Sequence, residues 1–137
     1  MNRCYLGLGS NQKNPERQIR QAIKALKNLP STHVNKISRL YWNKAWGVCS
    51  QQDFCNAVVE IKTILAPKVL LKLCKRIEDQ QGRTRKKHWG PRTLDIDIIF
   101  YGNRTISTHL LQIPHPYYKQ RDFVIIPLLE INPQLSR

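Results

Sequence analysis

Acidic residues are scarce in this chain. Asp and Glu together number 9 among 137 residues, whereas Lys and Arg number 23, which gives a formal net charge of +14. An imbalance of this size favours an anionic partner, such as a nucleic acid, an acidic membrane surface or a polyphosphate, and does not distinguish among them. Because carboxylates are so few, the positions where they occur are informative.

Long apolar runs and closely spaced cysteines are also missing. No segment approaches the ~18–20 continuous apolar residues of a membrane span, and the start of the chain lacks the apolar core of a signal peptide. The cysteines contain no Cys-x-x-Cys pair, so neither a zinc site nor a disulfide framework is expected. We therefore expect a cytoplasmic protein with reduced, mostly buried thiols. These are Cys4, Cys49, Cys55 and Cys74.

The length and composition suit one folded domain. A chain of 137 residues has room for one domain of ordinary size. Apolar residues make up 41% of the chain, which is enough to form a core, and no internal repeat or low-complexity tract divides it. We predict a single domain over residues 1–137.

Two helices are predicted from their start and stop signals. The first begins at Asn14-Pro15, a capping side chain followed by a proline at the first helical position, and ends near Pro30. The second begins at Ala66-Pro67 and ends at Gly82, a residue type that is common after helix C-termini. Each helix has one apolar stripe. The stripes comprise Ile19, Ala22, Ile23, Leu26 and Leu29 in the first helix and Val69, Leu70, Leu73, Cys74 and Ile77 in the second.

Strands are predicted on both sides of these helices. Residues 5–8 and 94–101 have strand character, residues 53–64 alternate between two faces, and residues 34–42 show only a weak extended pattern. The order strand, helix, two strands, helix, strand is typical of a ferredoxin-like α+β sandwich with a βαββαβ core. In that arrangement the helices cover one face of the sheet and leave the other available for a site. Additional elements follow at the C-terminus, including an apolar stretch over residues 123–129.

The most basic segment of the chain lies directly before two of its acids. Residues 82–92 carry five cationic side chains, and a solvated loop is the simplest interpretation of such a run. Asp95 and Asp97 follow at i and i+2 of a predicted strand, so both side chains are expected on one face. The residues expected to point to the core are Leu94, Ile96, Ile98 and Phe100.

This pair of carboxylates predicts a metal–phosphate site. Two neighbouring carboxylates repel each other, and a hard divalent cation relieves that repulsion. Mg²⁺ takes oxygen ligands and commonly shares one or two carboxylates with substrate phosphates. The alternative is that both aspartates pair with Arg83, Arg85 or Arg92, and the two arrangements are not exclusive.

Phe54 and Asn56 share one face of the strand at residues 53–64. An aromatic ring beside an amide suits a planar heterocycle, which stacks on one group and forms hydrogen bonds with the other. On these two residues alone, a partly exposed Phe and a solvent-facing Asn is the simpler interpretation. His115, between two prolines, is also weak evidence by itself, because a lone His is more often structural than catalytic.

A resemblance to a known family rests on one specific motif. The segment Trp89-Gly90-Pro91-Arg92-Thr93-Leu94-Asp95-Ile96-Asp97-Ile98-Ile99 resembles the signature of the 6-hydroxymethyl-7,8-dihydropterin pyrophosphokinases of the folate pathway. Further segments match in order and span nearly the whole chain: residues 5–11, 53–58, 76–78 with 82–83, and 113–116 through 121–123. The resemblance implies an enzyme that transfers pyrophosphate from ATP to the hydroxymethyl group of the pterin and leaves AMP.

The resemblance also implies a role for individual residues. Asp95 and Asp97 would hold two Mg²⁺ ions that bridge the ATP phosphates, and Phe54 and Phe123 would enclose the pterin ring. The expected catalytic residues are Arg83, Arg92, Asp95 and Asp97. The expected pterin site comprises Asn43, Ala45, Phe54, Asn56 and Phe123. The expected ATP site comprises Glu78, Arg83, Arg85, Trp89, Arg92, Ile98, His115 and Arg121. The segment 82–89 is expected to close over the site and exclude water.

Two stretches depart from the family pattern. Residues 41–47 replace a stretch that usually carries Thr and Pro around the pterin, and we expect altered packing there. Leu110 and Gln112 stand where polar or basic contacts to the nucleotide are common, and we expect them to weaken ATP binding.

Two other functions remain open at this point. A ferredoxin-like nucleic-acid-binding module would suit the positive charge, but the sequence has no aromatic-rich motif for stacking bases. A degenerate relative would bind its ligands without turnover, but the matched metal and arginine positions argue against it. We therefore expect a monomer that binds ATP and hydroxymethyl-dihydropterin and has no nucleic-acid or membrane partner.

Overall fold

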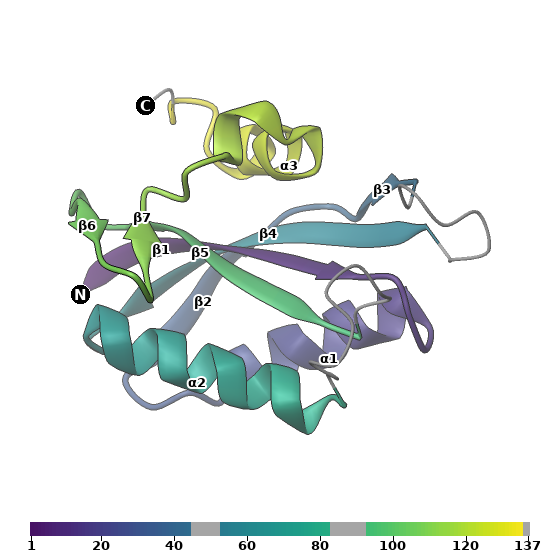
Figure 1. Cartoon of the computed structure of the whole chain (residues 1–137), viewed down its shortest axis with the longest axis horizontal. Coiled ribbons are helices and arrows are strands. Elements are labelled where there is room, and N and C mark those ends of the chain that lie inside the picture. The colour runs from purple at the N-terminus through teal and green to yellow at the C-terminus, as the bar shows by residue number, and fades with distance from the viewer. Residues whose placement is uncertain (45–52, 83–92, 136–137) are drawn as a thin grey trace.

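The fold is a mixed α/β structure built on an antiparallel sheet (Figure 1). The computed structural model describes residues 1–44, 53–82 and 93–135. The sheet contains β1 (Asn2–Ser10), β2 (Thr32–Ile37), β3 (Tyr41–Asn43), β4 (Phe54–Thr63) and β5 (Asp95–Tyr101). The α-helices are α1 (Pro15–Lys27), α2 (Pro67–Gln80) and α3 (Asp122–Ile131). A hairpin of β6 (Ile106–Ser107) and β7 (Gln112–Ile113) and a 3-10 turn (Tyr118–Gln120) connect β5 to α3.

The strands of the sheet lie in the order β2-β4-β1-β5, and β3 pairs with β4 beyond the end of β2. The weak pattern of residues 34–42 is explained by the break between β2 and β3. At this break the backbone N–H of Ser38 donates to Val58 O, and the Ser38 hydroxyl accepts from Val58 N–H, each at 2.9 Å. A side chain thus replaces a backbone partner, so one predicted extended segment becomes two strands along the same edge of β4.

The predicted helix boundaries are confirmed with small shifts. The side chain of Asn14 accepts a hydrogen bond from Arg17 N–H at 3.4 Å and caps α1. Gly82 follows α2 with a φ of +86°, a left-handed conformation that glycine adopts readily. Among the described residues, no helix has the length and apolar character needed to cross a membrane.

The first core lies between the sheet and the pair of helices α1 and α2 (Figure 1). Ile19 and Leu26 of α1 and Leu70 of α2 are fully buried against Leu6 of β1 and Ile61 of β4. The predicted stripe of α1 lies in this core, and so do Leu70, Cys74 and Ile77 of the stripe predicted for α2, but Val69 of that stripe is exposed. The three cysteines in the described residues, Cys4, Cys55 and Cys74, are buried and free, as expected.

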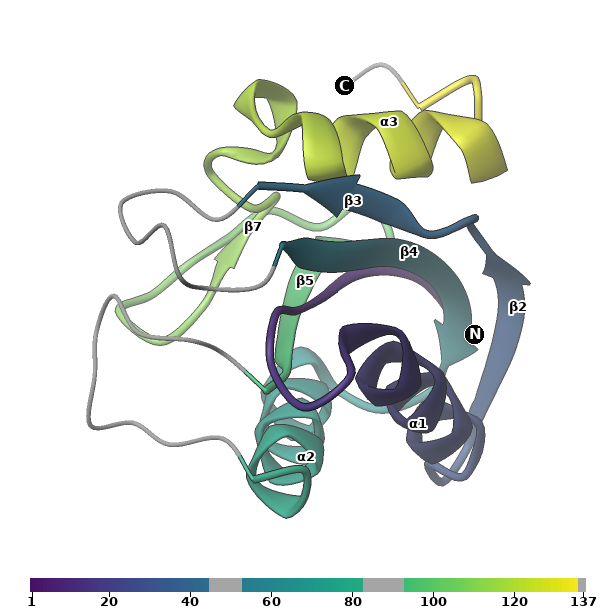
Figure 2. The same cartoon turned by 90° about the vertical axis from the view of Figure 1, so that its right-hand side faces the viewer.

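A second core lies on the opposite face of the sheet, beneath α3 (Figure 2). Val124 and Leu128 of α3 pack with Tyr5, Val58 and Phe100 of the sheet. The prediction that this face is left open is therefore wrong where α3 and the second core cover it. The cause lies in the sequence of α3, which is apolar around most of its circumference and needs a surface to cover it.

The side-chain alternation of β5 is interrupted. A register shift between Tyr5 and Leu6 of β1 leaves one extra residue in β5, so Tyr5 pairs with Phe100 while Leu6 pairs with Ile98. Phe100 consequently belongs to the second core and not, as predicted, to the face of Ile96 and Ile98. A β-bulge of this kind reverses the facing of every residue beyond it.

Candidate active site

The two predicted acids lie at the start of β5, opposite two glycines of β1. Asp95 pairs with Gly9 of β1, and Asp97 pairs with Gly7. On the other side of β1, Gly9 pairs with Asn56 of β4. Asp95 is partly buried and Asp97 is exposed. The antiparallel register therefore places the carboxylate of Asp95 on one side of Gly9 and the buried amide of Asn56 on the other. Gly9 has no side chain that could separate these two groups.

Gly7 and Gly9 leave this part of β1 without side chains on one face. A Cβ added to Gly9 would lie 3.1 Å from Oδ1 of Asn56, and one added to Gly7 would lie 3.4 Å from Cδ1 of Ile99. Glycine within a strand often marks the close approach of a ligand or of another group. Here Gly7 and Gly9 are partly exposed and form a floor of backbone beside the carboxylates, which suits a planar ligand.

Asn56 is held rigidly at one side of this floor. Its side chain is 3% exposed, and its Nδ2 donates to the backbone carbonyl of Tyr41 at 3.1 Å. It also donates to Oδ1 of Asn43, the last residue of β3. Asn43 and Asn56, both predicted for the pterin site, are therefore in direct contact.

The two predicted aromatic residues both lie on the α3 side of the sheet. Phe54 begins β4, two residues before Asn56, and is partly buried. Phe123 lies in the first turn of α3 and packs partly against the second core. The guanidinium of Arg121 lies 5.7 Å from the centre of the Phe123 ring, so the predicted phosphate ligand and the predicted ring partner are neighbours.

His115 is fixed beside the second core. Its backbone N–H donates to Ile99 O at 3.0 Å, and its Nδ1 accepts from Tyr117 N–H at 3.3 Å. Burial lowers the pKa of His115; the charge of Asp97 acts to raise it, and that of Arg121 acts to lower it further. His115 thus lies within electrostatic range of a predicted metal ligand and of a second predicted phosphate contact.

Two of the predicted ATP residues have their side chains in the interior. Glu78 of α2 is 4% exposed, and its Oε2 accepts from the backbone N–H of Ile96 at 2.7 Å. Ile98 is buried in the first core between the sheet and the helices. Neither position tests the predicted ATP contacts, which stay predictions.

Gly82 and Thr93, the described residues on either side of the segment 83–92, lie close together. The hydroxyl of Thr93 lies 3.2 Å from Oε1 of Gln12 and 3.5 Å from the carbonyl oxygen of Gly82. Gly82 and Thr93 therefore lie beside Gln12, which follows β1. The remaining predicted site residues lie outside the described part of the chain: Ala45, Arg83, Arg85, Trp89 and Arg92.

The residues that are described suit Mg²⁺ better than a metal held by protein ligands alone. Within residues 1–44, 53–82 and 93–135, no group of three or more His, Cys, Asp or Glu side chains forms a metal centre. Mg²⁺ does not need one, because it commonly binds one or two carboxylates and takes its other ligands from water and substrate phosphates. Asp95 and Asp97 supply that number of carboxylates at an accessible end of the sheet.

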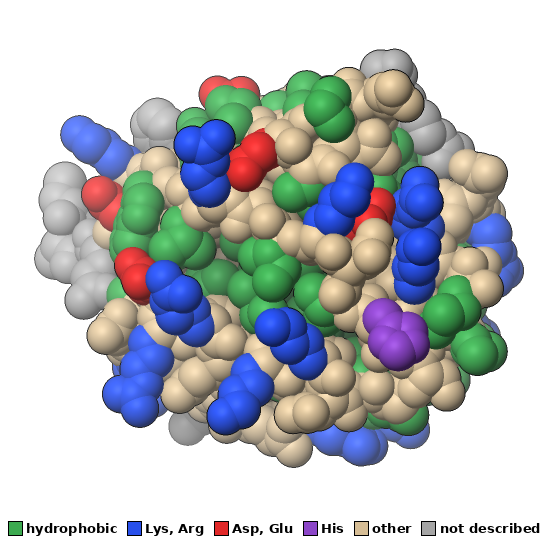
Figure 3. Space-filling view, turned by 180° about the vertical axis from the view of Figure 1, so that it is seen from behind, with side chains coloured by type: hydrophobic (Ala, Val, Ile, Leu, Met, Phe, Trp, Pro, Cys, Tyr) green, Lys and Arg blue, Asp and Glu red, His purple; other side chains and the backbone are tan. Residues whose placement is uncertain are grey.

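The positive charge of the chain is dispersed over its surface. Figure 3 shows Lys and Arg side chains scattered across one face of the molecule, with single acidic side chains between them. On α1, the cations outside the apolar stripe are exposed, as expected of a solvated helix face: Arg17, Arg20, Lys24 and Lys27. Much of the net charge therefore has no connection with the site.

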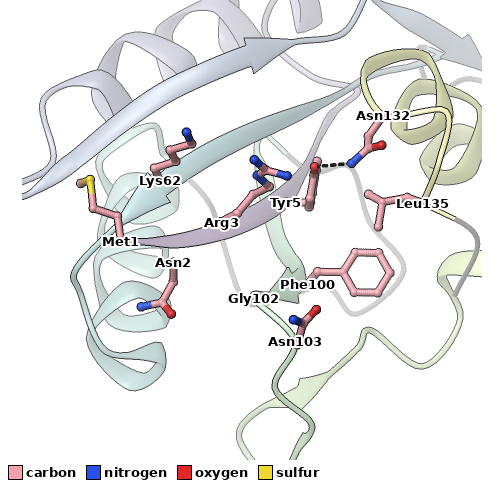
Figure 4. A pocket seen from close by; sticks show the side chains of 10 residues that line it. All are labelled: Met1, Asn2, Arg3, Tyr5, Lys62, Phe100, Gly102, Asn103, Asn132 and Leu135. Carbon is pink, nitrogen blue, oxygen red and sulfur yellow. Dashed lines mark hydrogen bonds between the residues drawn. The ribbon is translucent and has the colours of Figure 1, made fainter.

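A separate cavity of about 680 Å³ lies at the other end of β1 from Gly9 (Figure 4). Arg3, Tyr5 and Asn132 are among the residues that line it, and no predicted site residue is among them. The Tyr5 hydroxyl donates to the buried carboxylate of Glu60 and accepts from Nδ2 of Asn132 at 2.8 Å. This network ties the C-terminal end of α3 to the sheet, and the sequence reasoning did not anticipate it.

Comparisons with known proteins show the family of the chain. Residues 5–133 match the family model described as 7,8-dihydro-6-hydroxymethylpterin-pyrophosphokinase (HPPK). A 2-amino-4-hydroxy-6-hydroxymethyldihydropteridine pyrophosphokinase of Haemophilus influenzae is 46% identical over 96% of this chain and 82% of its own length. The Aquifex aeolicus protein of the same name is 44% identical over 96% of this chain and 81% of its own length.

The fold is also found among solved structures. A crystal structure of an HPPK-DHPS protein in complex with substrates superposes with a TM-score of 0.72 at 15% identity, covering 100% of this chain and 43% of that one. The curated relatives define a kinase, an enzyme that transfers a phosphate-containing group. More specifically, the chain belongs to the 7,8-dihydro-6-hydroxymethylpterin-pyrophosphokinase family, and the resemblance carried by the motif at residues 89–99 is confirmed.

Proposed function

We propose that this chain transfers pyrophosphate from ATP to the hydroxymethyl group of 6-hydroxymethyl-7,8-dihydropterin, a step of folate synthesis. The observation that carries the proposal is the family match over residues 5–133, which includes the acid pair and the glycine floor. In the reaction the hydroxyl oxygen forms a bond to the β-phosphorus of ATP. The bond between that phosphorus and the oxygen bridging it to the α-phosphorus breaks, AMP leaves with the bridging oxygen, and the hydroxyl proton is released.

The pterin ring is proposed to lie over Gly9. Asn56 offers a buried polar group at one side of this floor, and Phe54 and Phe123 supply aromatic surfaces on the same face of the sheet. Planar rings stack on aromatic side chains, and ring donors and acceptors bind a fixed amide. Asn43 and Ala45 complete the proposed pterin site.

The triphosphate is proposed to lie toward the start of β5. Asp95 and Asp97 would hold the two expected Mg²⁺ ions, which would neutralise the charge of the phosphates. The cations proposed around the phosphates are Arg83, Arg85, Arg92, His115 and Arg121, and Glu78, Trp89 and Ile98 complete the ATP site. Arginine suits this task because its planar group contacts two phosphate oxygens at once. Little covalent chemistry is required of the protein, so no residue is assigned as a dedicated base.

The remaining expectations about the molecule are part of the same proposal. The strand order β2-β4-β1-β5, with α1 and α2 on one face, supports a ferredoxin-like core. A single domain over residues 1–137, a monomeric state, a cytoplasmic location and the lack of nucleic-acid and membrane partners stay predictions.

The proposal is tested by incubating the purified protein with ATP, Mg²⁺ and hydroxymethyl-dihydropterin and measuring AMP. AMP that depends on the pterin is the expected result. ATP consumption without pterin, or tight and salt-sensitive RNA binding without AMP formation, would count against the proposal.

A further inference from the structure

The amide of Asn56 has one orientation that its surroundings allow. Its Nδ2 lies 3.1 Å from the carbonyl oxygen of Tyr41, 3.5 Å from the carbonyl oxygen of Phe54, and within hydrogen-bond distance of Oδ1 of Asn43. Backbone carbonyls accept hydrogen bonds and never donate them. The nitrogen of the Asn56 amide must therefore face β3, because the oxygen in that place would meet other oxygens.

The oxygen of the same amide faces the ligand side. Asn56 Oδ1 lies over Gly9, where an added Cβ would be 3.1 Å away. The amide nitrogen carries two hydrogens, and the oxygens of Tyr41 and Asn43 accept them. Asn56 consequently presents an acceptor alone to the floor of the site, and the ring edge that meets it must be a donor.

We infer that Asn43 is a positioning residue that fixes the Asn56 amide and so makes the site selective for a ring with an N–H donor at this edge. Without the Asn43 oxygen, one hydrogen of Asn56 Nδ2 is left with only the 3.5 Å contact to the carbonyl oxygen of Phe54, so the amide is held less firmly and its preference for a ring donor weakens. Asn43 thus acts on the substrate through Asn56. The inference rests on the proposed placement of the pterin over Gly9.

The test compares two substrates in three proteins. The 2-amino group of the pterin is a donor, and a 2-oxo analogue offers an acceptor in its place. The proteins are the natural chain, Asn43→Leu, which removes the acceptor at similar size, and Asn43→Asp, which keeps an oxygen acceptor there. The measured quantity is the ratio of kcat/KM for the amino and oxo substrates.

The natural chain and Asn43→Asp are expected to prefer the 2-amino substrate to a similar extent. In Asn43→Leu the preference is expected to fall about 3- to 10-fold, the effect of one hydrogen bond, while the KM for ATP stays unchanged. Equal losses in Asn43→Leu and Asn43→Asp would overturn the inference, because the acceptor would then not be the group that matters.

A second readout does not depend on catalysis. In a ¹⁵N NMR spectrum, Asn43→Leu is expected to shift one side-chain proton of Asn56 upfield, and Asn43→Asp is expected to leave it near its natural position. An unchanged Asn56 amide in Asn43→Leu would overturn the proposed orientation. A shifted amide with an unchanged substrate preference would overturn the role in selectivity and place the pterin elsewhere. If no variant forms AMP, the proposed function fails, and the NMR result still decides the orientation.

Discussion

Glu78 and Ile96 form the contact that joins α2 to the acidic end of β5. The buried carboxylate accepts a 2.7 Å hydrogen bond from the backbone N–H of Ile96, which lies between Asp95 and Asp97. Because β5 is at one edge of the sheet, no strand within the described part of the chain lies on its outer side to pair with this N–H. Glu78 supplies the missing partner and fixes the backbone that presents both aspartates.

Replacement of Glu78 should therefore affect the reaction through the position of β5. Glu78→Leu leaves the N–H of Ile96 unpaired and is expected to lower the free energy of unfolding by about 1–3 kcal/mol. It should also lower kcat for AMP formation. Glu78→Gln keeps an acceptor of the same length and should retain more of both. Urea unfolding and the AMP assay measure the two effects, and full activity in Glu78→Leu would contradict this role.

Asp97 is expected to be essential for turnover but not for folding. Its side chain is exposed, so Asp97→Ala should leave the free energy of unfolding nearly unchanged. The rate of AMP formation should fall by about 10²-fold or more, because a ligand of the proposed metal is lost. Glu16→Gln is a matched control, since Glu16 is a surface acid of α1 that pairs only with Arg20 in the interactions seen. A full rate in Asp97→Ala would refute the metal assignment.

Gly9 is expected to tolerate no side chain. In Gly9→Ala the new Cβ would lie 3.1 Å from Asn56 Oδ1, so either the amide of Asn56 or the backbone at residue 9 must move. The KM for the pterin should increase while the KM for ATP changes little. Gly7→Ala provides the comparison, because its Cβ meets only the end of the Ile99 side chain, at 3.4 Å. Steady-state kinetics with each substrate varied in turn measure the difference. Equal KM values for the pterin in both variants would contradict the proposed placement of the pterin over Gly9.

Glu60 is expected to make stability depend on pH in the acid range. Its burial acts to raise the pKa, but hydrogen bonds from Tyr5 and Asn35 and nearby positive charge outweigh this and hold the pKa of Glu60 below its usual 4.5. A lowered pKa in the folded state means that the ionised carboxylate stabilises the fold above pH 4.5 and that this contribution is lost as pH falls through the folded value.

Glu60→Gln therefore tests this network. At neutral pH the variant should unfold with a free energy about 1–3 kcal/mol below that of the natural chain, because the charge-assisted hydrogen bonds are weakened. The gap should narrow as the pH is lowered below 4.5, the usual value for this carboxyl group. Urea unfolding over a pH series measures it, and a gap that stays constant with pH would show that the Glu60 charge is not involved.

Features with a local cause could be predicted from the sequence. The start of α1 at Asn14-Pro15 and the end of α2 before Gly82 follow from capping chemistry at those residues. The acid pair at the start of β5 follows from the period of two in a strand. These positions needed no knowledge of the rest of the chain.

Features that depend on distant partners could not be predicted in this way. The bulge opposite Tyr5 and Leu6 depends on how β1 and β5 align, so Phe100 was placed on the wrong face. The cover of the second face by α3 depends on where the chain returns after β5. The i, i+2 spacing of Gly7 and Gly9 was a signal for a flat floor, but only the register with β4 and β5 shows what lies on either side.

The transfer of the β-phosphorus of ATP to the pterin with release of AMP is the central claim, and the fate of isotopically labelled ATP tests it most directly. ATP labelled at the β-phosphorus is incubated with Mg²⁺, hydroxymethyl-dihydropterin and the protein, and the products are separated. The account predicts that the β-label appears in the pterin product in amounts equal to the AMP formed. Label that remains in ADP, or that appears as free pyrophosphate or phosphate without a labelled pterin, would contradict it.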